Sequence, residues 1–213
     1  MIFDALTGAI VRRLNRQVLR FPPSREPPRL PPPDPEVNYL LYLHVPYCVV
    51  LCPFCSFHRV RFKPDRAAEY FACLRREIEI VTDAGYRFDE LYVGGGTPTV
   101  LPDELTRTVE LVGRLHALNA VSVETNPDDL EKESVQHLRD AGVNRLSVGV
   151  QSFDDDLLRE MERFEKYGSG ADIVRRVKQQ NGSFDTLNID MIFNLPHQSE
   201  ASLRRDLDIL VDE

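Results

Sequence analysis

From residue 39 onward, strand-like and helix-like segments alternate along the chain, and this alternation constrains the fold more than any other feature. Runs typical of strands lie at 39–45, 91–96, 120–125, 145–150 and 187–193. Helical periodicity covers 65–82, 103–117, 131–141, 154–179 and 199–212. Five strands that alternate with five helices predict a parallel sheet with right-handed crossovers, and therefore an α/β fold.

The predicted helices each have one apolar face. In 65–82 this face holds Ala67, Phe71, Leu74, Ile78 and Val81, and in 103–117 it holds Leu105, Val109, Val112 and Leu115. Asp103 is a candidate cap for the second of these helices. Active sites of parallel sheets lie at the carboxyl ends of the strands. Glycines 94–96 and three polar residues fall at such ends: Glu124, Gln151 and Asp190.

Composition divides the chain and limits its function. The 213 residues include 15 prolines, concentrated in 22–35, and carry a formal net charge of −8. We expect residues 1–38 to form an N-terminal helix, over 5–21, and a proline-rich linker, and 39–213 to form one core domain. The acidic balance argues against a nucleic-acid surface, and no apolar run is long enough for a membrane span. The N-terminus lacks the features of a signal peptide, so we expect a cytoplasmic protein.

Three of the four cysteines, Cys48, Cys52 and Cys55, follow the first predicted strand at the spacing C-x-x-x-C-x-x-C. Clustered thiols in a cytoplasmic protein favour a metal or redox site over disulfides. One interpretation is structural zinc, with His58 as fourth ligand. The other is an iron–sulfur cluster with one iron left open. Cys73 is a possible fourth thiolate, but its helical position predicts a core residue. The spacing alone leaves zinc and cluster equally open.

The glycines of "VGGGTPT" follow a predicted strand and precede a helix. No lysine follows them, so they do not form a phosphate-binding loop. Thr99 stands where the dinucleotide-binding fingerprint has its third glycine. Adjacent glycines let a ligand approach the backbone closely, although a tight turn explains them equally well.

Taken together, the segments resemble a known family. "CVVLCPFC" is similar to the signature of the radical S-adenosylmethionine superfamily. The chain resembles the branch of oxygen-independent coproporphyrinogen III oxidase and its heme-chaperone relatives, from about residue 42 to 196. The segments that carry this resemblance are "LYLHVPYC", "GGGTPT", "VETNPDDL", "SVGVQSF" and "NIDMIFNLP". Six motifs in order are far more specific than any one of them.

The resemblance implies two cofactors. Cys48, Cys52 and Cys55 would bind a 4Fe-4S cluster whose fourth iron takes the amino and carboxylate groups of S-adenosylmethionine. An electron from the reduced cluster would cleave a carbon–sulfur bond and yield methionine and a 5'-deoxyadenosyl radical, which abstracts hydrogen from the substrate. Phe54 would pack near the adenine, and Tyr42 would lie in the cofactor site.

The resemblance also implies polar contacts with S-adenosylmethionine. Gly95, Gly96 and Thr97 would hold its methionine part. Glu124 would bind a ribose hydroxyl or the ammonium group. Later segments would supply three further contacts, from Gln151, Arg163 and Asp190. Arg163 would bind the methionine carboxylate.

As implied by the resemblance, the fold is a partial (β/α)6 barrel, truncated after the fifth β/α unit, because the family normally has a sixth strand and a further C-terminal region. The implied function is that of a radical enzyme resembling coproporphyrinogen oxidase, which acts on a porphyrin-like or other conjugated substrate. A heme chaperone or carrier, or a radical methyltransferase of the same branch, is the alternative. An electron donor such as flavodoxin or ferredoxin is the expected protein partner.

Overall fold

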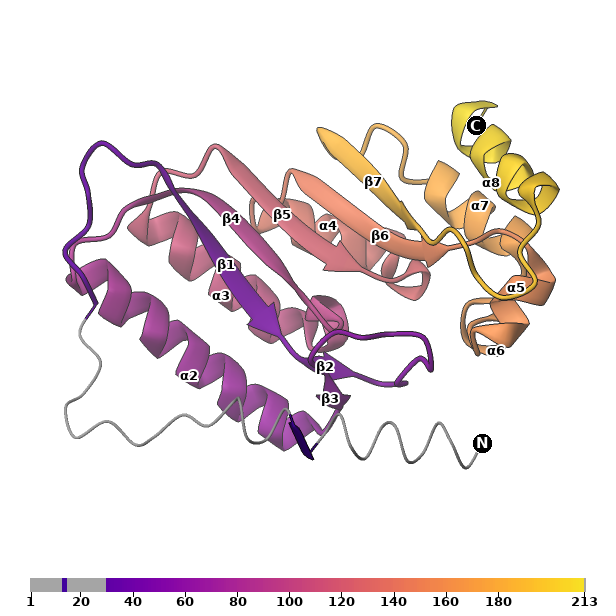
Figure 1. Ribbon diagram of the computed structural model, residues 1–213. Helices are drawn as coiled ribbons and strands as arrows, with labels where there is room; N and C mark the ends of the chain where they lie inside the picture. The colour runs from indigo at the N-terminus through magenta and orange to yellow at the C-terminus, as the bar shows by residue number, and fades with distance from the viewer. Residues whose placement is uncertain (1–12, 15–29, 213) are drawn as a thin grey trace. The chain divides into compact units, whose positions relative to one another are not determined.

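The computed structural model describes residues 13–14 and 30–212 (Figure 1). Contacts between Cα atoms divide the chain into two units, Met1–Pro31 and Pro32–Glu213. In the first unit, Arg13 and Leu14 are helical and exposed. The rest of the predicted N-terminal helix, over 5–21, and most of the predicted linker lie outside the described residues, so the boundary after residue 38 stays a prediction.

Five parallel strands form the central sheet of the second unit, in the order β1-β4-β5-β6-β7 (Figure 1). They are β1 (Tyr39–Val45), β4 (Phe88–Gly95), β5 (Ala120–Thr125), β6 (Arg145–Gln151) and β7 (Thr186–Met191). Each strand pairs with the next in this series, and among the described residues β1 and β7 each pair with one neighbour in this sheet only. The predicted parallel α/β fold and its open, partial barrel are therefore confirmed.

Helices connect the strands and pack beside one another. Between β1 and β4 lies α2 (Pro64–Asp83), and α3 (Pro102–Leu115) and α4 (Lys132–Asp140) follow the next two strands of the sheet. Helix α2 contacts α3, and α3 contacts α4. Most of the predicted apolar residues of the first two helices are buried, as expected: Ala67, Phe71, Leu74, Ile78, Leu105, Val109 and Val112.

Two local predictions in these helices are wrong. Cys73 is exposed rather than part of the core, because it lies on the face of α2 opposite the buried residues. Asp103 lies in the first turn of α3 and does not cap it, since the N-cap residue is Leu101, without a side-chain cap. A carboxylate in the first turn still interacts favourably with the helix dipole.

The predicted helical segment 154–179 is divided into three helices: α5 (Asp155–Glu160), α6 (Phe164–Tyr167) and α7 (Gly170–Lys178). The backbone is left-handed at Glu162 and at Gly168, which interrupts helical geometry at both junctions. Ser169 and Asp172 then form a capping box that starts α7. The last helix, α8 (Glu200–Asp212), follows β7 as predicted. Among the described residues, no helix is long and apolar enough to cross a membrane.

Side chains alternate between the two faces of the inner strands, and one face carries residues of the site. Along β5 and β6 every second residue is buried, among them Val123 and Val148. The intervening positions are partly buried, except for the exposed Arg145, and belong to the opposite face of the sheet. Glu124 pairs with Ser147 across β5 and β6, and Gly149 pairs with Asp190 across β6 and β7. This face therefore carries polar residues and glycines near the carboxyl ends of the strands.

A second, two-stranded sheet flanks the cysteine segment and is absent from the predicted elements. It consists of β2 (Tyr47–Cys48) and β3 (Val60–Arg61), which are parallel. Two backbone hydrogen bonds join its strands, from Val60 N–H to Pro46 O at 2.7 Å and from Phe62 N–H to Cys48 O at 2.9 Å. The segment between these strands is therefore a closed loop with both ends fixed.

Candidate active site

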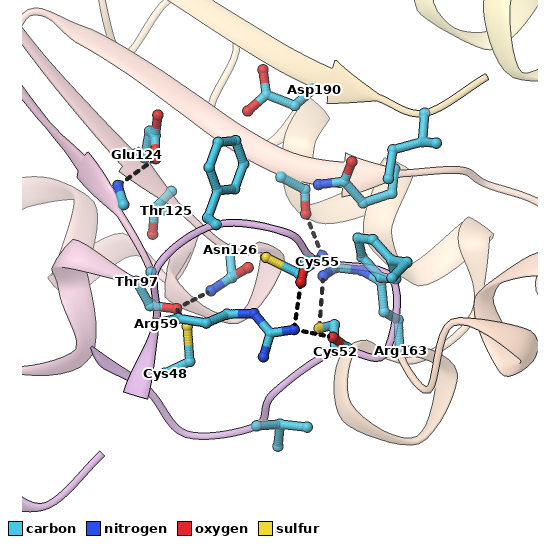
Figure 2. Close-up of a pocket in the computed structure, with 18 of the residues that line it drawn as sticks. Cys48, Cys52, Cys55, Arg59, Thr97, Glu124, Thr125, Asn126, Arg163 and Asp190 are labelled. Atoms are coloured by element: carbon cyan, nitrogen blue, oxygen red, sulfur yellow. Dashed lines mark hydrogen bonds between the residues drawn. The ribbon is translucent and has the colours of Figure 1, made fainter. Parts of the chain in front are cut away.

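A cavity of about 470 Å³ opens at the carboxyl ends of the strands, between the cysteine loop and the sheet (Figure 2). Eleven of the twelve predicted site residues line it: Cys48, Cys52, Phe54, Cys55, Gly95, Gly96, Thr97, Glu124, Gln151, Arg163 and Asp190. These residues come from the cysteine loop, from β4 and the turn after it, from β5, β6 and β7, and from the junction before α6. Tertiary structure thus brings together residues that are up to 142 positions apart in the sequence.

The cysteine loop is held by its own backbone and by one arginine. Cys55 N–H donates to Cys52 O at 3.3 Å. Arg59 Nη2 donates to the carbonyl oxygens of Cys52, at 2.5 Å, and of Cys55, at 2.7 Å (Figure 2). Two of the three candidate ligands therefore have their backbone fixed by the same guanidinium group.

Cys48 lies deeper than the other two thiols and is 8% exposed. Burial raises the pKa of its thiol, while a hydrogen bond from Thr97 Oγ1 to the sulfur, at 3.7 Å, acts in the opposite direction. Asn126 Nδ2 donates to the same Thr97 oxygen at 2.9 Å. The hydroxyl of Thr97 is thereby oriented toward the sulfur.

The described side chains do not form a site for a single ion. Within residues 13–14 and 30–212, no three His, Cys, Asp or Glu side chains converge closely enough to hold one metal ion. His58, the fourth ligand of the zinc interpretation, is exposed, and its ring faces that of His44, with 6.2 Å between centroids. Cys73 does not line the cavity. The three free thiols line one cavity, and such a donor set fits a group larger than a single ion, in which each thiolate would bind a different metal.

The glycines after β4 let two segments approach each other closely. Gly95 has φ of +122°, and Gly96 has no room for a side chain, because a Cβ there would lie 2.7 Å from Tyr47 O and 2.9 Å from Cys48 Sγ. Gly96 N–H donates to Val45 O, and Thr97 N–H donates to Tyr47 O, both at 2.8 Å. These bonds attach the glycine segment to the start of the cysteine loop.

Glu124 is fixed at the end of β5 by two donors. Tyr92 Oη donates to its Oε1 at 2.7 Å, and Gly95 N–H donates to its Oε2 at 2.9 Å. A Cβ at Gly94 would lie 2.8 Å from the same carboxyl group, so a side chain there would displace the carboxylate. The carboxylate is therefore positioned before any ligand arrives.

Two further predicted residues lie at the ends of β6 and β7. Gln151 has φ of +79°, an uncommon conformation for a non-glycine residue that is often found at functional sites. Asp190 accepts from Ser147 Oγ, at 3.1 Å to each carboxylate oxygen, and from Asn188 Nδ2 at 2.7 Å. Burial raises the pKa of Asp190, and the neighbouring Glu124 carboxylate adds to this effect.

Arg163 is 3% exposed and lies against the cysteine loop. Its Nη2 donates to Gly149 O, and its Nη1 lies 3.8 Å from Cys52 Sγ. Its guanidinium carbon is 4.3 Å from the centroid of the Tyr167 ring, a cation–π contact. Its Nε atom is buried without a hydrogen-bond partner. A buried donor without a partner is rare in folded proteins and calls for an explanation.

Tyr42 is the one predicted residue that does not line the cavity. Its side chain is 51% exposed, and its hydroxyl lies 2.9 Å from His44 Nδ1. His44 Nε2 contacts His58 O at 3.0 Å, so this ring must donate there, and Nδ1 can then accept from the tyrosine. The structure therefore connects Tyr42 to the cysteine loop through His44.

Several residues of the cavity escaped the sequence reasoning. Tyr92, Asn126 and Arg59 line it and bind predicted site residues. Two had a usable signal, since Tyr92 lies in a strand that ends in glycines and Asn126 comes directly after a strand. For Arg59 the sequence holds no local signal, because its role depends on how the loop folds back.

Comparison with known proteins shows the family of this chain. The family model described as Radical SAM superfamily matches residues 42–210, which is most of the chain. The chain belongs to the radical SAM superfamily. Members of this superfamily use a 4Fe-4S cluster and S-adenosylmethionine, which agrees with the two predicted cofactors.

Relatives of two kinds, heme chaperones and oxygen-independent coproporphyrinogen III oxidases, match most of the chain. Heme chaperone HemW of Bacillus subtilis is 34% identical over 173 residues, which cover 78% of this chain and 45% of the relative. Oxygen-independent coproporphyrinogen III oxidase of Escherichia coli is 33% identical over 175 residues, which cover 79% of this chain and 38% of the relative. The chain thus spans less than half the length of these relatives.

A solved structure agrees with both the fold and the branch. The radical SAM enzyme HemN of Escherichia coli, a coproporphyrinogen III oxidase, superposes with a TM-score of 0.71 and 29% identity. The superposition covers 82% of this chain and 42% of HemN. Together with the relatives in sequence, it confirms the branch of the superfamily that the motifs predict.

Proposed function

We propose that this chain is the core of a radical SAM enzyme of the coproporphyrinogen oxidase-like branch, which acts on a porphyrin-like or other conjugated substrate. The observation that carries the proposal is that one cavity is lined by three thiols of one loop and by polar residues from the ends of four successive strands. When bound, the cluster would supply an electron and S-adenosylmethionine the 5'-deoxyadenosyl radical that abstracts hydrogen from the substrate.

The donor set fits a cluster with an open iron. Cys48, Cys52 and Cys55 are free cysteines on one loop, and a 4Fe-4S cluster normally takes four thiolates. With Cys73 exposed on α2, the described cysteines offer three ligands at this cavity. Three thiolates leave one iron for the amino and carboxylate groups of S-adenosylmethionine.

Charge in the cavity is divided between its two sides. Glu124 and Asp190 belong to β5 and β7, while Arg59 and Arg163 lie against the cysteine loop. A ligand that carries both a cationic and a carboxylate group is oriented by such a division. We assign Glu124 to the ammonium group or a ribose hydroxyl, and Arg163, a buried cation that lines the cavity, to the methionine carboxylate.

The remaining assignments concern the glycine segment and the adenosine part of the cofactor. The N–H groups of Gly95, Gly96 and Thr97 all donate within the protein, so the segment would receive an ammonium group through its carbonyl oxygens. Phe54 would pack near the adenine, and Gln151 and Asp190 would contribute hydrogen bonds. Tyr42 is proposed to act through His44, given that it lies outside the cavity.

A heme chaperone or carrier is the second candidate, because HemW of Bacillus subtilis is as similar to the chain as the oxidases are. A radical methyltransferase of the same branch is the third. Both oxidase and methyltransferase need an electron donor, for which flavodoxin or ferredoxin is the proposed partner. A cytoplasmic location is proposed from the clustered free thiols, which an oxidising compartment would convert to disulfides.

The test is anaerobic reconstitution of the protein with iron and sulfide, followed by dithionite and S-adenosylmethionine. We expect a brown protein that releases 5'-deoxyadenosine. A cluster without such release, combined with tight heme binding, would favour the chaperone. A colourless protein with one bound zinc would refute the proposal altogether.

Cysteine variants test the ligand set directly. Cys48→Ala, Cys52→Ala and Cys55→Ala should each lose most of the iron, because two thiolates are too few for the cluster. Cys73→Ala is the matched control and should keep the parent's iron content, since its thiol is exposed on α2. Equal iron loss in the control would mean that the cluster has four protein ligands.

A further inference from the structure

Arg59 has an unusual position for a charged side chain. It directly precedes β3 and turns back into the loop, where it lies between Cys52 and Cys55 (Figure 2). One nitrogen, Nη2, donates to both of their carbonyl oxygens, at 2.5 and 2.7 Å. Its Nε atom is buried without a hydrogen-bond partner, and the residue lines the cavity. Among the ion pairs of the described residues, none includes Arg59.

The two carbonyl oxygens require such a donor. Cys52 and Cys55 are close enough in the turn for Cys55 N–H to contact Cys52 O, and both carbonyl oxygens face the same guanidinium group. Carbonyl oxygens that converge in this way repel one another, and a cation that donates to both offsets this repulsion. The guanidinium therefore keeps the loop in the conformation that turns its thiols toward the cavity.

Arg59 and the third cysteine, Cys48, line the same cavity. Arg59 and Arg163 are the two arginines that line the cavity. Three thiolates and a cluster would add negative charge there, and the reduction potential of a cluster depends on net charge and hydrogen bonding around it.

We propose that Arg59 is a positioning residue that holds the cysteine loop in its ligating conformation and, through its charge, raises the reduction potential of the bound cluster. This proposal rests on the proposed function, namely that the three cysteines hold a cluster. It assigns Arg59 no contact with reacting atoms. The two parts of the role depend on different properties, the shape of the guanidinium and its charge, so they can be separated.

Two substitutions separate shape from charge. Arg59→Lys keeps the charge but replaces the planar guanidinium with a single ammonium group. Arg59→Gln removes the charge and keeps a shorter donor. Arg61→Gln is the matched control, because Arg61 lies two residues away on β3 and is exposed. Each protein is reconstituted with limiting iron and sulfide to measure iron per chain, and separately with excess iron and sulfide to measure the midpoint potential.

We expect both Arg59 variants to bind less iron than the parent when iron is limiting. The Arg59→Lys cluster should keep the parent's potential, whereas in Arg59→Gln the equilibrium constant for reduction should fall by about tenfold, which is ~59 mV for a one-electron couple. Arg61→Gln should match the parent in both measurements. If Arg59→Gln folds normally but binds no cluster, the positioning role is supported and the Arg59→Lys potential tests the charge.

Several results would overturn the inference. Parent-like iron content and potential in Arg59→Gln would show that the contact has no role toward the cluster. An equal shift in Arg61→Gln would show a general effect of surface charge, and a changed potential in Arg59→Lys would refute the role of charge. If the parent itself binds no cluster, the proposed function fails, and this outcome is distinct from failure of the Arg59 proposal.

Discussion

Replacement of Gly96 by alanine is the most direct test of how the cysteine loop is attached to the sheet. The added Cβ would lie 2.7 Å from Tyr47 O, 2.9 Å from the carbonyl carbon of Pro46 and 2.9 Å from Cys48 Sγ. Two of these atoms belong to the backbone, so a side-chain rotation cannot relieve the contact. The start of the cysteine loop must move away from the glycine segment.

The expected cost follows from these distances. Insertion of a methyl group into a well-packed site costs about 1–3 kcal/mol of the free energy of unfolding. Each kcal/mol lowers the melting temperature of a protein of this size by about 2–4 °C. Because Cys48 Sγ is one of the displaced atoms, Gly96→Ala should also bind less iron after reconstitution.

Gly113 provides the matched control for this substitution. It lies inside α3, and a Cβ there would meet no atom within 4 Å. Gly113→Ala should therefore stabilise the protein by about 0.5–1 kcal/mol, because alanine favours the helix, and should leave the iron content unchanged. Thermal unfolding and iron analysis of both variants are the assay. A Gly96→Ala protein with parent-like stability and iron content would refute the packing described here.

Two further predictions concern carboxylates. Glu124→Gln keeps the shape of the side chain but loses its charge, so affinity for S-adenosylmethionine, titrated spectroscopically, should fall roughly ten- to a hundredfold while the iron content stays the same. The control Glu110→Gln, at an exposed residue, should keep the parent's affinity, and parent-like affinity in Glu124→Gln would place the ammonium group elsewhere. Burial raises the pKa of Asp206 above 3.8 despite hydrogen bonds from Ser152 and Phe153 and a nearby Arg205, with a smaller contribution from the Asp154 carboxylate. Its contribution to the free energy of unfolding is therefore present below pH 3.8 and lost as pH rises through the raised pKa. Urea unfolding at a series of pH values should show this loss in the parent but not in Asp206→Asn, and identical pH profiles of the two proteins would contradict the prediction.

The sequence by itself determined the order and type of the main elements. Alternating apolar runs and helical periodicity are local properties, and they identified all five strands of the sheet, with β1 and β5 at their observed bounds. The alternation of strands and helices then located the site at the carboxyl ends of the strands. The motif residues around Cys48 and Glu124 could be assigned to one cavity because each follows or ends a strand.

Local pattern could not determine which face of a helix is covered or where a helix is interrupted. Cys73 neighbours apolar residues in the sequence, yet the helix directs it away from the sheet. The segment 154–179 is helical in its periodicity, but left-handed backbone at Glu162 and Gly168 divides it. The exposure of Cys73 depends on how α2 packs, and the interruptions of 154–179 depend on the path of the chain beside the site.

Only the tertiary structure decided which polar groups meet. Arg163 contacts Cys52 across 111 positions of sequence, and Asp206 of α8 binds Ser152 and Phe153 across more than 50. Arg59 contacts residues near it in sequence, but the contact exists because β2 and β3 pair and turn the loop back on itself. Sequence periodicity fixes the direction of a side chain relative to its own element, whereas a hydrogen bond also depends on the position of a second element, which is set by the packing of the whole sheet.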